Sequence, residues 1–184
     1  MSGYLSMIFL FSILLVSTFT KISDAAFTLE KTQENALITL YNATNGPEWK
    51  WWNRLHAWGI KINSSNQYYA SSDPCNAWEG IKCDSMPTSS TSIVIELNLT
   101  DHNLVGALPS TFFNDLNTVE TIELNSNVLT GSIPAVSSNP INNMATLDLR
   151  SNRLAGTIPS SLSLALNLQN LHLSNNILTG KLAA

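Results

Sequence analysis

The chain has 184 residues, enough for one modest domain. Charged residues make up 12% of it, about half of the usual share of roughly 25%. The formal net charge of -4 excludes the basic surface of a nucleic-acid-binding protein. Two cysteines allow one disulfide at most, and without a second pair they argue against a metal site.

The first 25 residues differ in kind from the rest. Residues 5–19 are mostly apolar, and a short polar stretch with the small residues Ser23 and Ala25 follows. This order is typical of a secretory signal, so residues 1–25 are predicted to be removed and the chain to be secreted or held at the cell surface. The alternative is an uncleaved membrane anchor, although a spanning helix needs about 20 apolar residues. Secretion would place the chain in an oxidising compartment, and Asn-x-Ser/Thr tripeptides make glycosylation candidates of Asn42, Asn63 and Asn98.

Residues 26–92 are predicted to form a unit of their own. The apolar spacing over 28–45 predicts a helix with Thr28 as its N-cap and Gly46-Pro47 as its stop. The residues of its buried face would be Leu29, Ala36, Leu37, Leu40 and Tyr41.

All five tryptophans lie within residues 49–78. Two interpretations of this cluster are open. The indoles either form the core of a cap that closes the end of the following domain, which we favour, or provide a stacking platform for sugars.

A repeat occupies residues 93–184. Four segments, 95–109, 122–134, 147–159 and 171–182, share one pattern, and their leading apolar residues are spaced by 25, 25 and 24 positions. Those residues are Leu97, Ile122, Leu147 and Leu171. Each segment begins with an apolar-x-apolar strand and then turns at a glycine. Because one such coil cannot bury its own apolar edge, the coils are predicted to stack and to join their strands into a parallel sheet.

An asparagine recurs three residues after the second strand leucine, at Asn127, Asn152 and Asn176. Its amide could bond backbone groups of its own coil and of the next, which would otherwise cost roughly 1–3 kcal/mol each. The first repeat has His102 in that place, as expected of an atypical terminal repeat.

The run L-x-L-x-x-N-x-L-x-G-x-I-P resembles the plant-type leucine-rich repeat of receptor-like kinase ectodomains, receptor-like proteins and inhibitors of wall-degrading enzymes. The run Cys75-x-x-Trp-x-Gly-Ile-x-Cys83 resembles the amino-terminal cap of the same family and implies a Cys75–Cys83 disulfide. Residues 40–49 look like the variant cap of such proteins in unicellular eukaryotes, although the loop at 59–72 is longer than usual. The implied fold is an α/β-type, right-handed solenoid of about four repeats. Its parallel sheet would line the concave face, behind a helical, disulfide-closed cap.

Residues between the buried strand positions would point from the concave face, where solenoids bind partners. The candidate residues are Glu96, Asn98, Thr100, Thr121, Glu123, Asn125, Thr146, Asp148, Arg150, Asn170, His172 and Ser174. Neighbouring coils lie about 4.8 Å apart, so Glu123 and Asp148 should be close. A hydrated acidic stripe and a site for a basic or polyhydroxy partner are both open. A glycosidase pair is disfavoured because an open sheet does not bury an acid. A sugar on Asn98 would move the ligand further along the face.

The sequence therefore predicts an extracellular module that recognises a protein, peptide or polysaccharide. A structural surface or matrix protein is the alternative, and a polysaccharide-acting enzyme is the least favoured. With no nucleophile motif, phosphate loop or metal spacing, we expect no catalysis, cofactor or nucleic-acid partner. The chain stops inside the fourth repeat, so Leu173 and Leu178 are expected either to continue into a longer protein or to form an edge for self-association. Membrane attachment would require such a continuation or an uncleaved signal.

Overall fold

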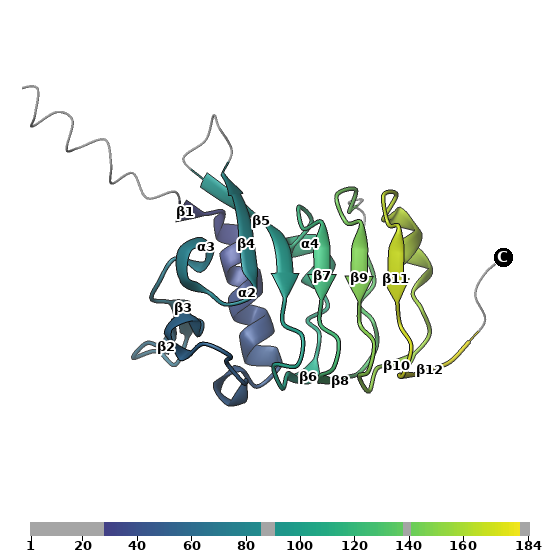
Figure 1. Cartoon of the computed structure of the whole chain (residues 1–184), viewed down its shortest axis with the longest axis horizontal. Coiled ribbons are helices and arrows are strands. Elements are labelled where there is room, and N and C mark those ends of the chain that lie inside the picture. The colour runs from purple at the N-terminus through teal and green to yellow at the C-terminus, as the bar shows by residue number, and fades with distance from the viewer. Residues whose placement is uncertain (1–27, 86–90, 138–140, 181–184) are drawn as a thin grey trace, which may run out of the picture.

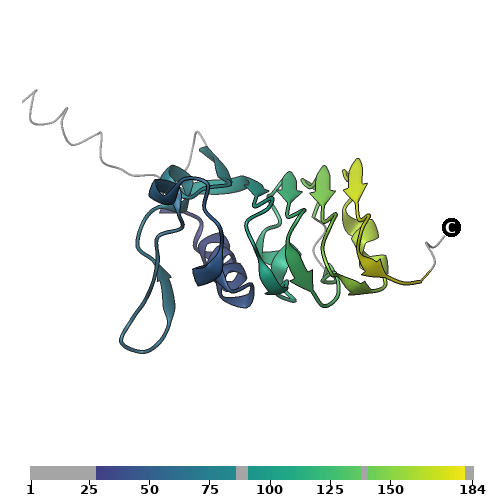
Figure 2. The same ribbon diagram turned by 60° about the horizontal axis from the view of Figure 1, so that its bottom comes forward.

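The computed structural model describes residues 28–85, 91–137 and 141–180, so the predicted signal at 1–25 lies outside the described residues. Parallel strands succeed one another along an elongated body, with residues 28–85, hereafter the amino-terminal segment, at one end (Figures 1 and 2). The sheet has the order β1-β5-β7-β9-β11. Its strands are β1 (Thr28–Leu29), β5 (Thr91–Asn98), β7 (Thr121–Glu123), β9 (Thr146–Asp148) and β11 (Asn170–His172).

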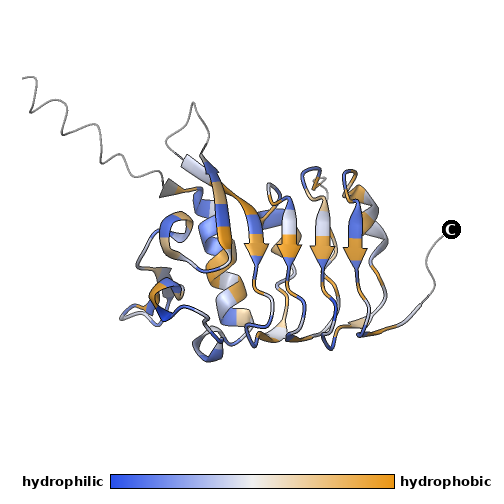
Figure 3. Cartoon of the chain, viewed as in Figure 1, coloured by the Kyte–Doolittle hydropathy of each residue, from blue (hydrophilic) through white to orange (hydrophobic). Residues whose placement is uncertain are grey.

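The 25-residue period sets the register of this sheet. Leu97 pairs with Ile122, Ile122 with Leu147, and Leu147 with Leu171, so apolar residues recur at one level of the strands (Figure 3). The predicted parallel stacking is confirmed. Leu97, Ile122 and Leu147 are at most 1% exposed, and each such burial contributes roughly 1.5–3 kcal/mol.

Short elements close the far side of each coil. Two-stranded parallel sheets join β6 (Val105–Ala107) to β8 (Val128–Thr130), and β10 (Ala155–Gly156) to β12 (Ile177–Leu178). The helix α4 (Phe112–Asp115) and the 3-10 helix η3 (Ser160–Leu164) complete the coils. Phe112 and Phe113 are each 1% exposed and pack edge to face with centroids 5.3 Å apart. The core therefore lies between the main sheet and these short elements.

The recurring asparagines bond their own coil and the coil before it. The Asn127 amide donates to the carbonyls of Leu124 and Leu99, and its oxygen accepts from the backbone N–H of His102 and of Leu104. Asn152 and Asn176 repeat this arrangement. The expected direction was wrong: the amides reach toward the preceding coil, not the next, because the side chain leans back along the stack axis.

The amino-terminal segment packs against the β5 end of the stack. Its elements are α2 (Lys31–Ala43), η1 (Gly46–Glu48), η2 (Arg54–His56), β2 (Ile60–Ile62), β3 (Tyr68–Ala70), α3 (Pro74–Ala77) and β4 (Ile81–Ser85). Strand β4 runs antiparallel to β5, and a disulfide joins Cys75 to Cys83. Among the described residues, no helix combines the length and apolarity needed to cross a bilayer.

The predicted helix start was wrong. Helix α2 begins at Lys31 and is capped by the side chain of Glu30, which accepts from the Gln33 N–H. Thr28 belongs instead to β1, which pairs in parallel with β5. The Glu30 N–H donates to the Ser92 carbonyl at 3.0 Å, so pairing with a strand distant in sequence replaces the first turn of the expected helix.

Candidate ligand-binding face

Polar side chains project from the main sheet between its buried positions. This surface, hereafter the strand face, is built by β5, β7, β9 and β11 and by the residue two positions after the end of each strand. Its residues are Glu96, Asn98, Thr100, Thr121, Glu123, Asn125, Thr146, Asp148, Arg150, Asn170, His172 and Ser174. The ladder aligns Asn98 with Glu123, Glu123 with Asp148, and Asp148 with His172. The structure therefore brings together the predicted middle column.

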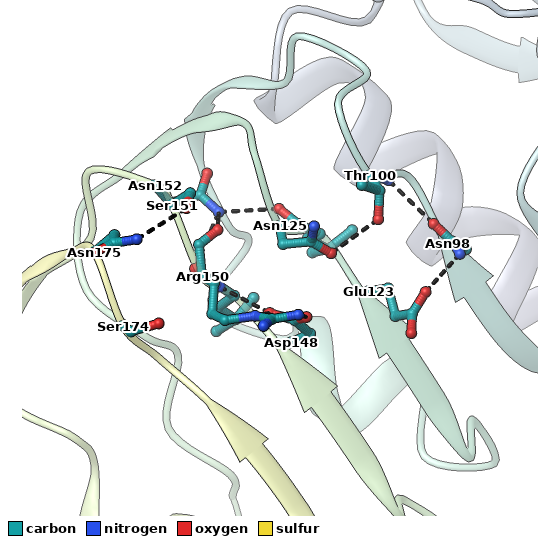
Figure 4. Close-up of polar contacts among 12 residues, drawn as sticks. Asn98, Thr100, Glu123, Asn125, Asp148, Arg150, Ser151, Asn152, Ser174 and Asn175 are labelled. Carbon is teal, nitrogen blue, oxygen red and sulfur yellow. Dashed lines mark hydrogen bonds and ion pairs between the residues drawn. The ribbon is translucent and has the colours of Figure 1, made fainter.

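Hydrogen bonds between neighbouring coils hold these side chains in place (Figure 4). The Asn98 amide donates to the Glu123 carboxylate at 2.6 Å, and the Thr100 hydroxyl donates to Asn125 at 2.9 Å. Further along, Asn170 donates to the Thr146 hydroxyl at 3.3 Å. A partner would thus meet a polar surface that is already ordered, which reduces the side-chain entropy lost on binding.

Asp148 departs from the expected hydrated acidic stripe. It is 4% exposed, and the Arg150 guanidinium covers it with hydrogen bonds of 3.0 and 2.6 Å to the two carboxylate oxygens. Burial raises the pKa of Asp148, but the hydrogen bonds from Arg150 and the charges of Arg150 and His172 outweigh it, so this pKa lies below its ordinary value. The same contact raises the pKa of Arg150. The surface presented at this point is a guanidinium rather than a carboxylate.

The other acids of the face differ in their partners. Glu96 lies 3.7 Å from Lys82 of β4, in an exposed pair that screening keeps weak. Glu123 forms no ion pair with any described residue and is half-buried. Of the two carboxylates that were expected to lie close together, only that of Glu123 lacks an ion pair with a described residue, and the Arg150 guanidinium lies on the next coil.

This arrangement is poorly suited to acid–base hydrolysis. A general acid needs a pKa raised by burial, whereas Arg150 holds Asp148 ionised. Hollows of about 620, 450 and 300 Å³ lie in the amino-terminal segment, and no strand-face residue lines any of these three. Within the described ranges, no group of three or more His, Cys, Asp or Glu side chains could hold a metal ion. The face can form hydrogen bonds and ion pairs over an open area.

Sequence reasoning missed the residues that turn the chain away from the strand face. Asp101, Ser126, Ser151 and Asn175 all have left-handed backbone, with φ of 56°, 59°, 54° and 58°. They recur at the repeat period, and Asn175 donates to Ser151 at 3.4 Å, so they extend the polar surface beyond Ser174. Small polar residues tolerate this conformation, and their regular recurrence was the available signal.

Comparisons with known proteins agree with this geometry. The family model described as Leucine Rich Repeat matches residues 143–164 and 167–184. No curated protein matches the chain. The fold is shared with the leucine-rich-repeat ectodomain of the receptor kinase SOBIR1 from Arabidopsis thaliana, with a TM-score of 0.60 and 22% identity over 83% of this chain and 71% of that one.

Two further solved structures are similar. The complex of BIR3 and SERK2 from Arabidopsis thaliana has a TM-score of 0.56 and 28% identity, covering 78% of this chain and 68% of the matched one. The structure of PEPR1 with AtPEP1 has a TM-score of 0.59 and 28% identity, over 82% of this chain. The present chain spans only 19% of the matched PEPR1-AtPEP1 chain.

Proposed function

We propose that this chain is an extracellular recognition module of the leucine-rich-repeat type that binds a protein or peptide through its strand face. Residues 26–92 would cap the stack and residues 93–184 would form its repeats. The observation that carries the proposal is the ordered polar network of the face, in which Asn98, Glu123 and Thr100 are fixed by neighbouring coils. Such a surface offers directional contacts without an enclosed reaction site.

The comparisons support the same kind of function. Two of the similar structures, each with 28% identity to this chain, are complexes, of BIR3 with SERK2 and of PEPR1 with AtPEP1. The charges of the strand face favour a partner that carries both positively and negatively charged groups. Glu123 would pair with a basic group, and the outer edge of Arg150, whose side chain is 47% exposed, would donate hydrogen bonds to a carboxylate or a carbonyl.

Secretion is part of the proposal. A disulfide such as Cys75–Cys83 persists in oxidising compartments, and the sequon residues Asn42 and Asn63 are exposed. A sugar on Asn98 would stand beside Glu123, to which its amide donates, and would move the contact area toward β9 and β11.

The mature mass of the protein secreted from a eukaryotic cell, before and after glycan removal, tests this placement. We expect a start at Ala26, no free thiol and a loss of mass from Asn42 and Asn63. A protein retained in the cell with Met1, two free thiols and no sugar would overturn the extracellular assignment.

The face itself is tested with Glu123→Lys. The secreted wild-type chain, this variant and Glu48→Lys are used to capture extracellular proteins from the producing organism, with quantification by mass spectrometry. Glu48 is exposed on η1 and provides the same charge change elsewhere. We expect partners retained by the wild type and by Glu48→Lys but lost with Glu123→Lys. Equal capture by all three would exclude the strand face.

A further inference from the structure

A hollow of about 620 Å³ opens on the amino-terminal segment. It is formed by η1, the stretch that follows it and η2, and it shares no lining residue with the strand face. The lining residues are Pro47, Trp49, Lys50, Trp51, Arg54 and Ala57. Two aromatic rings and two cationic side chains therefore line the same hollow.

Three tryptophans of this region have an indole N–H that donates a hydrogen bond to another described residue, whereas the indole N–H of Trp51 does not. Trp49, Trp58 and Trp78 are at most 5% exposed, and their indoles donate at 2.9 Å to the Thr44 carbonyl, the Glu79 carbonyl and the Ser72 hydroxyl. These three belong to the core. Trp51 is half-buried, and its indole N–H donates to no other described residue. Buried indole N–H groups normally find an acceptor, so Trp51 retains a donor for a ligand.

The Trp51 ring is held in position without a ligand. Its centroid lies 5.5 Å from that of Trp49 and 6.2 Å from that of Trp58, and the His102 ring meets it edge on at 5.8 Å. The Glu79 carboxylate accepts hydrogen bonds from the backbone N–H groups of Trp52 and Asn53, at 3.1 and 3.0 Å. The indole is therefore a rigid apolar surface at the rim of the hollow.

The charge of the hollow is opposite to that of the whole chain. Lys50 and Arg54 line it, although the net charge is -4. Arg54 is exposed and forms no ion pair with any described residue. Lys50 lies 3.5 Å from Asp101 with both side chains exposed, a pair that contributes little and can be exchanged. Both cations are available to an anion.

We propose that this hollow binds an acidic saccharide, a chain of pyranose rings that bear carboxylates. The indole N–H lies in the plane of the Trp51 ring and would donate to a hydroxyl of an adjacent sugar unit, while one pyranose ring would lay its C–H face on the indole. Its carboxylate would meet the planar guanidinium of Arg54, which matches a carboxylate with two parallel donors, while Lys50 would contact a neighbouring unit. The site is independent of the strand face, so the chain could hold a matrix polysaccharide and a protein partner together.

Titration of the full secreted chain with a galacturonate hexasaccharide tests this site, with a neutral glucose hexasaccharide and a hexaglutamate peptide as comparison ligands. Binding is measured by calorimetry and by the indole N–H resonances. We expect the acidic saccharide to bind and to shift the Trp51 indole signal, while the signals of Trp58 and Trp78, which do not line the hollow, remain unchanged. Equal binding of the neutral sugar, equal binding of the peptide, or an unmoved Trp51 signal would overturn the proposal.

Charge variants complete the test. Arg54→Glu should weaken the acidic saccharide about tenfold, equivalent to about 1.4 kcal/mol, because it replaces an attraction by a repulsion. Lys61→Glu makes the same charge change on the exposed strand β2, outside the hollow, and should leave the affinity within about twofold. A loss that is equal in both variants would indicate attraction to the whole surface and would contradict a defined site.

Discussion

Replacing Asn127 by alanine should destabilise the stack far more than the loss of side-chain volume alone would, because the amide also forms hydrogen bonds between coils. Three backbone groups lose the partner that the Asn127 amide supplies: the His102 and Leu104 N–H groups and the Leu99 carbonyl. The Leu124 carbonyl keeps a donor, because Asn152 also bonds it. Three buried groups at roughly 1–3 kcal/mol each set the scale, and since water can enter the vacated space we expect the lower end, about 3 kcal/mol.

Urea unfolding followed by circular dichroism measures this loss, with Asn125→Ala as the matched control. Asn125 lies on the strand face, and its side chain only accepts from the Thr100 hydroxyl, so its removal should cost at most about 0.5 kcal/mol. Asn176→Ala should fall between the two, because Asn176 is only partly buried. Equal effects of Asn127→Ala and Asn125→Ala would refute the assignment of the amides as structural links between coils.

Four further predictions concern the described contacts. Arg150→Ala should lower the free energy of unfolding at pH 7, as urea unfolding would measure, because it removes charge-assisted hydrogen bonds from the buried Asp148 carboxylate. The pKa of Asp148 is lower in the folded chain than its ordinary value, so ionised Asp148 stabilises the fold above about pH 4, and this stabilisation is lost as the pH falls through the folded-state pKa. The free energy of unfolding of Asp148→Asn, measured against pH, should not show this loss in acid. A pH dependence equal to that of the wild type would contradict the role of Asp148. Gly106→Ala should destabilise by about 2 kcal/mol, because φ is +139° and a Cβ would collide with the Ala43 carbonyl; an unchanged thermal midpoint would contradict this. The double variant Cys75→Ser/Cys83→Ser should lose about 2.5 kcal/mol in urea unfolding, from a closed loop of about nine residues, and a loss below about 0.5 kcal/mol would show that the loop is ordered without its bridge.

The strand register could be predicted from the sequence because it depends on a local period. Leu97, Ile122, Leu147 and Leu171 occupy equivalent places, and identical coils can stack their apolar positions in one way only. The start of α2 could not be predicted, because Thr28 is drawn into β1 by a strand more than 60 residues away. The antiparallel pairing of β4 with β5 joins strands that follow one another in the chain, but β4 lies outside the repeats, so the repeat period did not predict it.

The residues of the strand face could be predicted from the alternation of buried and exposed strand positions, but the charges that the face presents to solvent could not. Asp148 and Arg150 are two residues apart and therefore share a face, yet the pattern alone does not tell whether the guanidinium extends to solvent or folds onto the carboxylate. In the structure it folds onto Asp148, which is 4% exposed. The division of the tryptophans into buried and partly exposed residues likewise depends on how the indoles pack against one another within the amino-terminal segment.

Carboxyl footprinting of the chain, free and bound to a partner captured by its secreted form, tests the recognition surface most directly. A water-soluble carbodiimide should label Glu123 and Glu48 in the free chain, and mass spectrometry of peptides reports each site. We expect the partner to protect Glu123, while Glu48, on η1, stays labelled. Full labelling of Glu123 in the complex would place the partner elsewhere and contradict recognition through the strand face.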